Sequence, residues 1–424
     1  MSKPIIRFNG YTEDWEQRKL GEICERVTRK NKNNESDLPL TIASQFGLID
    51  QRDFFNKVVA AKDMSNYYLL KRGEFAYNKS YSNGFDYGSI KRLNAYEQGC
   101  LSTLYICFEI TSDEVESDYL ECFFDTLKWY GDVSMICAEG ARNHGLLNVD
   151  TKGFFDEVTI DLPKSLGEQK KISAYLNTLD NLITLHQRKC EQTKKLKKYM
   201  LQKMFPQNGA SVPEIRFAGF AEDWEQRKFI DCFDYLQNNS LSRAELSDED
   251  GEILNVHYGD ILVKFGEVID LETDTLPTVV DDSILTRYIN SILQDGDVVI
   301  ADAAEDETVG KCSEIKGCEG KKVLAGLHTI PVRPKVKYAY GFLGYFMNSA
   351  AYHNQLLPLM QGTKVSSISK TAIQDTLLNI PSNIEEQKRI ADYFTGLDRL
   401  ITLHQRKCEE LQKIKKYMLQ NMFA

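Results

Sequence analysis

Residues 167–205 read GEQKKISAYLNTLDNLITLHQRKCEQTKKLKKYMLQKMF, and residues 385–423 read EEQKRIADYFTGLDRLITLHQRKCEELQKIKKYMLQNMF. Twenty-six of these 39 positions are identical, so the two stretches are copies of one segment. A shorter copy precedes each of them: RFNGYTEDWEQRKL at 7–20 and RFAGFAEDWEQRKF at 216–229. The chain is therefore a tandem duplication, in the order short repeat, variable region and long repeat, followed by the same three segments again.

The long repeat has the pattern of a coiled-coil helix. In its first copy the apolar residues Ile172, Leu176, Leu179 and Ile183 alternate in the spacing of a seven-residue repeat. Neither copy contains a proline, and about 35 residues at 1.5 Å each give a helix of about 50 Å. Two such seams in one chain predict two long antiparallel coiled-coil helices, with one variable domain at each end and an internal pseudo-two-fold repeat.

The two variable regions share almost no residues but have the same organisation. Both contain β-branched and aromatic runs between turn residues, which indicate strands, and both end in a run that closes on proline, IDLP or LNIP. Helical stretches such as DYLECFFDTLKWYG interrupt the strands. We therefore predict an α+β protein with two mixed α/β domains and two spacer helices. The expected segments are domain 1 at 1–164, helix 1 at 165–206, domain 2 at 207–381 and helix 2 at 382–424.

Composition and charge exclude several classes of protein. The chain is 42% hydrophobic but has no apolar run as long as a membrane span and no signal-peptide start, so we expect a cytoplasmic globular protein. Its ten cysteines lack the spacing of metal or redox sites, which predicts no metal site and no disulfides. The net charge of −10 argues against a self-sufficient nucleic-acid binder, yet residues 167–205 are basic. An acidic chain with a basic helical segment is typical of a subunit of a complex.

Two unlike domains, each preceded by WEQRK and followed by EQK-x-I and LD-x-LI on a long helix, resemble the specificity subunit of type I restriction–modification systems. The likeness covers essentially the whole chain. Both halves contain further phrases in the same order. GEFAYNKSYSNG and GDVVIADAAEDETVGK resemble a strand and turn of a target recognition domain. EGARNHGLLNVDTKGFFDEVTIDLP and QGTKVSSISKTAIQDTLLNIP resemble its closing segment.

The resemblance implies that each variable domain reads one half of a split double-stranded DNA sequence, while the helices set the spacer between the halves. Two adenine-N6 methyltransferase (modification) subunits would dock on the chain, and motor–nuclease (restriction) subunits would join them for cleavage. The specificity subunit of that family is not an enzyme and binds no cofactor, because its partners hold the methyl donor and ATP. A helix of about 50 Å suits two readers spaced by about one turn of B-DNA, roughly 34–36 Å.

DNA readers place Arg, Lys, Asn, Gln or Ser on loops that reach base edges in the major groove. Each domain offers two such loops, one after an apolar strand and one beside a glycine turn. The alternative interpretation is that these are ordinary solvated turns. The predicted DNA-binding residues are Asn78, Lys79, Ser80, Ser82, Asn83, Arg142, Asn143 and His144 in the first domain, and Lys311, Lys364, Ser366 and Ser367 in the second.

Two alternative functions remain open on the sequence. Asp302, Glu305, Asp306 and Glu307 form an acidic cluster that would suit a self-contained metal-dependent endonuclease, but the first domain has no such acids at the matching place. A solvated loop is the simpler interpretation, although aspartate and glutamate also accept hydrogen bonds from cytosine. The second alternative is a scaffold that binds protein partners through both domains. The chain has no phosphate-binding loop and no Asn-Pro-Pro-aromatic motif, so we predict no catalytic residues.

Overall fold

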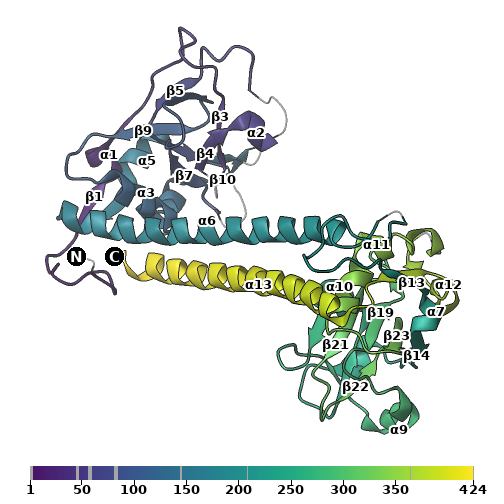
Figure 1. Ribbon diagram of the computed structural model, residues 1–424. Coiled ribbons are helices and arrows are strands. Elements are labelled where there is room, and N and C mark those ends of the chain that lie inside the picture. Colours follow the sequence, from purple (N-terminus) through teal and green to yellow (C-terminus); the bar gives the residue numbers. More distant parts are fainter. Residues whose placement is uncertain are drawn as a thin grey trace. The chain divides into compact units, whose positions relative to one another are not determined.

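The computed structural model describes residues 3–43, 47–55, 60–80, 85–143, 146–207, 209–362 and 364–423, without the side chains of 138–143 and 146 (Figure 1). The chain divides into two compact units: unit 1 is Met1–His186 with Arg406–Ala424, and unit 2 is Gln187–Gln405. Each unit therefore combines one variable domain with a part of both long repeats. No helix within the described ranges is long and apolar enough to cross a membrane.

Each long repeat forms a helix of 38 residues, α6 (Leu166–Lys203) and α13 (Ile384–Asn421). The apolar positions that the sequence singles out face the domain cores: Ile172 and Leu176 are buried in unit 1, and Ile390 and Phe394 are buried in unit 2. The remaining faces are rich in lysine and glutamate, which suits exposed helix surface. The prediction of two long helices is confirmed.

Within unit 2, the end of α6 and the start of α13 run antiparallel. Cys190 Sγ lies 4.0 Å from the carbonyl oxygen of Ile401. Further along α6, Lys197 Nζ lies 2.9 Å from Asp398 Oδ2, so the partner number falls as the α6 number rises. This confirms the antiparallel direction in unit 2, whereas regular coiled-coil packing stays a prediction.

The first domain is built on a four-stranded antiparallel sheet with the order β2-β9-β6-β7. The middle strand β6 is aromatic and fully buried at Phe75 and Tyr77, as expected of a strand covered on both faces. Phe75 stacks on Phe108 of β9, with 5.3 Å between ring centroids. The strands of this domain are β1 (Glu16–Lys19), β2 (Cys24–Arg26), β3 (Leu40–Ala43), β4 (Gly47–Asp50), β5 (Tyr68–Lys71), β6 (Phe75–Asn78), β7 (Ser89–Arg92), β8 (Gln98–Leu101), β9 (Ile106–Ile110), β10 (Cys137–Asn143), β11 (Leu146–Val149) and β12 (Thr159–Leu162).

Short helices pack around this sheet. The Glu116 side chain accepts a hydrogen bond from Tyr119 N and so caps the start of α3, which lies beside β7. The predicted helical stretch DYLECFFDTLKWYG is divided between two helices, because the segment after Asp125 leaves the helical conformation at Thr126. The helices before α6 are α1 (Leu20–Ile23), α2 (Gln51–Phe55), α3 (Ser117–Asp125), α4 (Tyr130–Ile136) and α5 (Thr151–Glu157).

The second domain contains a five-stranded sheet with the order β14-β23-β19-β21-β17 and a four-stranded sheet with the order β15-β18-β16-β22. The middle strand β19 reads VVIA and is buried throughout, so β-branched residues occupy the place that aromatic residues take in β6. The strands are β13 (Glu225–Lys228), β14 (Phe233–Tyr235), β15 (Leu246–Ser247), β16 (Ile253–Val256), β17 (Val268–Asp270), β18 (Thr278–Val279), β19 (Val298–Ala301), β20 (Ala303–Ala304), β21 (Cys312–Lys316), β22 (Lys322–Ala325), β23 (Thr329–Pro334), β24 (Ser366–Ser367) and β25 (Leu377–Ile380).

The helices of the second domain are short, and α10 is their buried core element. Phe342, Tyr345 and Phe346 of α10 are all buried, which explains why this helix is apolar on every side. The α-helices are α7 (Phe229–Cys232), α8 (Tyr258–Val263), α9 (Leu285–Tyr288), α10 (Phe342–Asn348), α11 (Ala350–His353) and α12 (Lys370–Ile373), and the 3-10 helices are η1 (Arg243–Glu245), η2 (Asp282–Ile284), η3 (Ile289–Ser291) and η4 (Leu357–Leu359).

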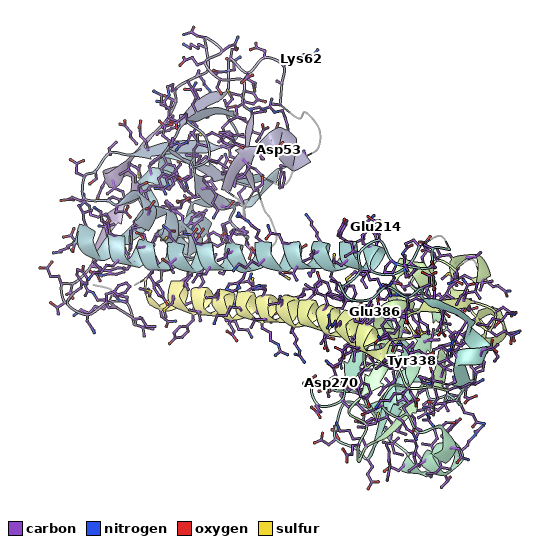
Figure 2. The ribbon with its side chains drawn as sticks, viewed as in Figure 1. Asp53, Lys62, Glu214, Asp270, Tyr338 and Glu386 are labelled. Atoms are coloured by element: carbon purple, nitrogen blue, oxygen red, sulfur yellow. The ribbon has the colours of Figure 1, made fainter. Side chains whose placement is uncertain are left out.

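The short repeat joins each domain to its own long helix. β1 pairs with β12 and β13 pairs with β25, so the EQRK strand lies beside the strand that precedes the helix. Both proline-closed runs, IDLP and LNIP, are therefore strands as predicted. An arginine of each short repeat binds a buried glutamate of the long helix: Arg7 binds Glu168 in unit 1, and Arg216 binds Glu386 in unit 2. Figure 2 labels Glu386, which lies in the first turn of α13.

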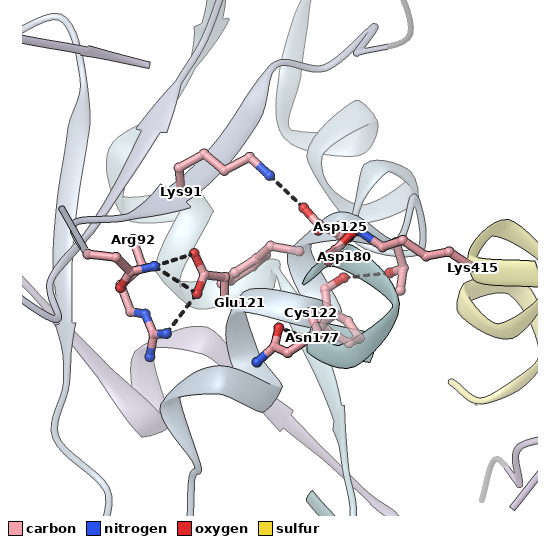
Figure 3. Close-up of polar contacts among 12 residues, drawn as sticks. Lys91, Arg92, Glu121, Cys122, Asp125, Asn177, Asp180 and Lys415 are labelled. Carbon is pink, nitrogen blue, oxygen red and sulfur yellow. Dashed lines mark hydrogen bonds and ion pairs between the residues drawn. The ribbon is translucent and has the colours of Figure 1, made fainter. Parts of the chain in front are cut away.

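Unit 1 also holds the end of α13 through half-buried charges (Figure 3). Lys415 Nζ lies 2.7 Å from Asp180 Oδ1 of α6 and 3.5 Å from Asp125 Oδ2 of α3. Lys91 Nζ approaches the other oxygen of Asp125 at 2.6 Å. Burial raises the pKa of Asp125, but the charges of the two lysines outweigh burial and hold the pKa below its ordinary value. In unit 2, Lys197 is likewise shared between Asp398 and Glu267.

Candidate nucleic-acid interface

The first candidate loop lies where the central strand β6 ends. Its backbone turns at Asn78, whose Oδ1 accepts a hydrogen bond from Ser80 N at 3.0 Å. Asn78, Lys79 and Ser80 are half-buried at this edge of the sheet. Burial, with the nearby charge of Arg26, lowers the pKa of Lys79. Ser82 and Asn83, which the sequence also predicts here, lie outside the described residues.

The second candidate loop of this domain connects β10 and β11. Arg142 and Asn143 are the last residues of β10 and pair with Leu147 and Leu146 of β11, while their side chains and His144 lie outside the described part of the chain. Leu147 N donates a hydrogen bond of 2.9 Å to the carbonyl oxygen of Lys79. Two loops that the sequence predicted separately, more than sixty residues apart, are therefore neighbours at one edge of the first domain.

In the second domain a corresponding pair of segments meets after β19. The short strands β20 and β24 are antiparallel, with Ala303 opposite Ser367 and Ala304 opposite Ser366. The loop before β24 exposes Lys364. It turns sharply at Gly362, where φ is +111° and a Cβ atom would lie 2.0 Å from the carbonyl oxygen of Val365. Only glycine fits this turn, so the hairpin shape depends on that residue.

Lys311, the remaining predicted lysine, has a different environment. Lys311 Nζ donates to the carbonyl oxygens of Leu262 and Phe265, at 3.0 and 3.1 Å, near the end of α8. Burial lowers the pKa of this lysine. The side chain thus satisfies helix carbonyls inside its own domain, and its contact with DNA stays a prediction that the geometry does not favour.

Beside β24 lies a cluster of polar and aromatic side chains, of which the sequence analysis named only one. Asp302 directly follows β19, and its Oδ1 lies 3.2 Å from His328 Nδ1. His328 has a positive φ of 55°, which is uncommon for a residue other than glycine and often marks functional sites. Tyr258 packs edge-on against the His328 ring, with 5.2 Å between centroids. Burial raises the pKa of Asp302, and the neighbouring His328 opposes that rise.

The sequence offered a signal for only one member of this cluster. Asp302 belongs to the acidic cluster that the sequence analysis named, whereas His328 and Tyr258 are distant in sequence and follow no motif. Glu305, Asp306 and Glu307 are exposed in the loop after β20. Within the described ranges, no three His, Cys, Asp or Glu side chains are grouped so that they would hold a metal ion.

Comparison with known proteins identifies the family. The family model described as "Type I restriction modification DNA specificity domain" matches the chain twice, at residues 12–195 and 221–413. A similar curated protein is the type I restriction enzyme MjaVIII specificity subunit of Methanocaldococcus jannaschii, 26% identical over 284 residues. That match covers 66% of this chain and 64% of the relative's length.

Solved structures share the fold. The type I restriction–modification system S subunit from M. genitalium has a TM-score of 0.58 at 11% identity, and the match covers 100% of this chain and 99% of the other. A chain from a structure of type I restriction–modification complex assembly and conformational transition has a TM-score of 0.52 at 17% identity, covering 98% of both chains. At these identities the likeness concerns the fold alone.

Proposed function

Since the chain belongs to the family of type I restriction–modification DNA specificity proteins, we propose that it is the specificity subunit of such a system, and that each of its two domains reads one half of a bipartite, asymmetric DNA target. One observation carries this proposal. Both domains bring the end of a central strand and a following hairpin together at one edge, yet the residues displayed there differ between the domains. A backbone arrangement that both domains share, with different polar side chains on it, is what two readers of different half-sites require.

The displayed side chains suit direct readout of bases. In the first domain the described members are Asn78, Lys79 and Ser80, and in the second they are Lys364, Ser366 and Ser367. Amides, hydroxyls and ammonium groups are the donors and acceptors that distinguish base pairs in the major groove. Arg142, Asn143, His144, Ser82 and Asn83 remain predicted contributors on the same loops of the first domain.

The long helices carry repeated apolar positions that suit the docking of two copies of one partner. In unit 1 the exposed residues are Leu182 and Leu185 of α6, and in unit 2 their repeat counterparts Leu400 and Leu403 of α13 are exposed as well. The same holds for the later positions of the repeat, which are Ile414 and Tyr417 in unit 1 and Leu196 and Tyr199 in unit 2.

Exposed apolar side chains that recur at the same repeat positions in both units suit contact with a partner. Each unit displays the same set of four, so one kind of partner can bind once to each unit. In the proposed function this partner is an adenine-N6 methyltransferase subunit, bound in two copies, with motor–nuclease subunits joining the assembly for cleavage. The chain itself recognises DNA and spaces the half-sites, and its partners carry the chemistry.

Reconstitution tests the proposal directly. The chain is purified with its methyltransferase subunits, and DNA protection is measured on a random-sequence duplex library at fixed salt, since affinity without stated salt has no meaning. Selection of one split sequence with a fixed gap would support a specificity subunit. A complex that binds all duplexes alike would refute it and favour the protein-binding scaffold.

A further inference from the structure

Strand register identifies one position that is equivalent in the two domains but carries opposite charge. In the first domain, Phe108 of β9 lies opposite Phe75 of β6. In the second, Val332 of β23 lies opposite Val298 of β19. The outer strand of each sheet shows that these pairs correspond. Arg26 of β2 lies opposite Phe108, and Tyr235 of β14 lies opposite Val332.

Lys79 lies four residues after Phe75 in the first domain, and Asp302 lies four residues after Val298 in the second. A backbone hydrogen bond also links each of these positions to the hairpin of its own domain. The Lys79 carbonyl oxygen accepts a 2.9 Å hydrogen bond from Leu147 N, and the Asp302 carbonyl oxygen accepts a 2.8 Å hydrogen bond from Ile368 N. One backbone position, fixed by a sheet and a hairpin, therefore carries an ammonium group in one domain and a carboxylate in the other.

Both charged side chains are partly removed from water. Among the described residues, no carboxylate forms an ion pair with Lys79, and its environment is desolvated beside Arg26. The partner of Asp302 is His328, half of whose side chain is exposed, while Asp302 itself is 26% exposed. A half-buried charge without a strong partner is costly. Such an arrangement persists where a ligand supplies the missing partner.

We propose that this position is a base-reading residue in each domain, and the inference rests on the proposed function. Lys79 donates to the O6 and N7 acceptors of a guanine, and Asp302 accepts from the N4 amino group of a cytosine, each in the half-site of its own domain. His328, held in a left-handed conformation beside Asp302, orients the carboxylate. The charge at this shared backbone position thereby helps to decide which base each domain prefers in its half-site.

Two substitutions test this proposal. Each should change which base the complex prefers at one position, an effect that damage to the fold does not produce. Glutamine and asparagine pair with the N6 and N7 edge of adenine. Lys79→Gln should therefore change one guanine of the first half-site toward adenine, and Asp302→Asn should change one cytosine of the second half-site toward adenine. The nearly isosteric Asp302→Asn change preserves the volume of the side chain.

The assay measures the affinity of the chain with its methyltransferase subunits for duplexes that carry every single base-pair change in the target. We expect the preference for the original base to fall about ten- to hundredfold at one position of one half-site, with the other half-site unchanged. Controls are Lys71→Met, an exposed lysine of β5, and Glu307→Gln, an exposed acid of the loop after β20. Circular dichroism confirms folding, and if one variant misfolds the other decides.

Two results would overturn the inference. The base preference of both variants could equal that of the wild type at every position, or all duplexes could be weakened equally with a smaller dependence on salt, which is the behaviour of a phosphate contact. Failure of the proposed function looks different. In that case the wild-type complex itself shows no preference for any split sequence, before a substitution is made.

Discussion

Removing the charge of Lys415 should loosen the end of α13 from the first domain. This lysine binds Asp180 and Asp125, and its own side chain is only 20% exposed (Figure 3). Breaking a buried ion pair by removing one partner costs about 3–5 kcal/mol, because the other charge is left unpaired. Two features reduce this cost here. Lys91 still binds Asp125, and Asp180 is 45% exposed, so water screens it. We expect Lys415→Met to destabilise unit 1 by about 2 kcal/mol.

Urea unfolding followed by tryptophan fluorescence measures this effect. The chain has three tryptophans, and a Trp224→Phe background leaves Trp15 and Trp129, which are both buried in unit 1. With a urea dependence of about 2 kcal/mol per molar, the unfolding midpoint of unit 1 should fall by about 1 M. Because both remaining tryptophans lie in unit 1, their fluorescence follows the unfolding of unit 1 separately from that of unit 2.

A matched lysine on the same helix provides the control. Lys407 forms an exposed pair with Glu410, three residues further along. Its replacement by methionine should change the stability by less than about 0.5 kcal/mol. Equal midpoints for Lys415→Met and Lys407→Met would refute the argument that the ion pairs of Lys415 with Asp125 and Asp180 hold α13 in place.

Three further outcomes follow from the same contacts. The pKa of Asp125 is lowered in the folded chain. Its stabilisation is therefore complete above the unfolded pKa of about 3.9 and is lost as the pH falls through the folded pKa. The difference in unfolding free energy between wild type and Lys415→Met, measured by urea titration at several pH values, should shrink in acid and not grow. Leu403→Glu, at a side chain 58% exposed, should leave the melting temperature within about 2–4 °C and weaken methyltransferase binding at least tenfold in calorimetric titration, whereas unchanged binding would place the partner elsewhere. Gly362→Ala, at φ +111°, should abolish the preference for the second half-site and spare the first in the binding assay, and loss of both would contradict a local effect.

The repeats made the helices and the overall plan predictable. Apolar residues at coiled-coil spacing placed Ile172 and Leu176 on a buried helix face, and the structure buries both. The proline-closed runs were predicted as strands because alternation and a terminal proline are local signals, and β12 and β25 confirm them. Trp15 and Trp224 of the short repeats are buried at equivalent places, which agrees with their identical sequence context.

The candidate site was predictable only in outline, because its geometry depends on pairing between distant segments. The sequence analysis selected Lys79 in the first domain and Lys311 in the second, whereas strand register makes Asp302 the counterpart of Lys79. The phrases that begin at Gly73 and Gly296 hold Lys79 and Asp302 at the same distance from the glycine, and the pairing of β6 with β9 and of β19 with β23 supports this match. His328 was also missed, because a positive φ at a histidine and its approach to Asp302 arise from tertiary contacts.

Methylome sequencing of a host that carries this gene, with and without its deletion, tests the central claim most directly. If the chain reads two half-sites for a methyltransferase, deletion removes one split, asymmetric N6-methyladenine motif and leaves all other methylation unchanged. The lost motif then gives both half-sites and the spacer together. An unchanged methylome in a strain that expresses the chain with its methyltransferase would contradict the specificity role.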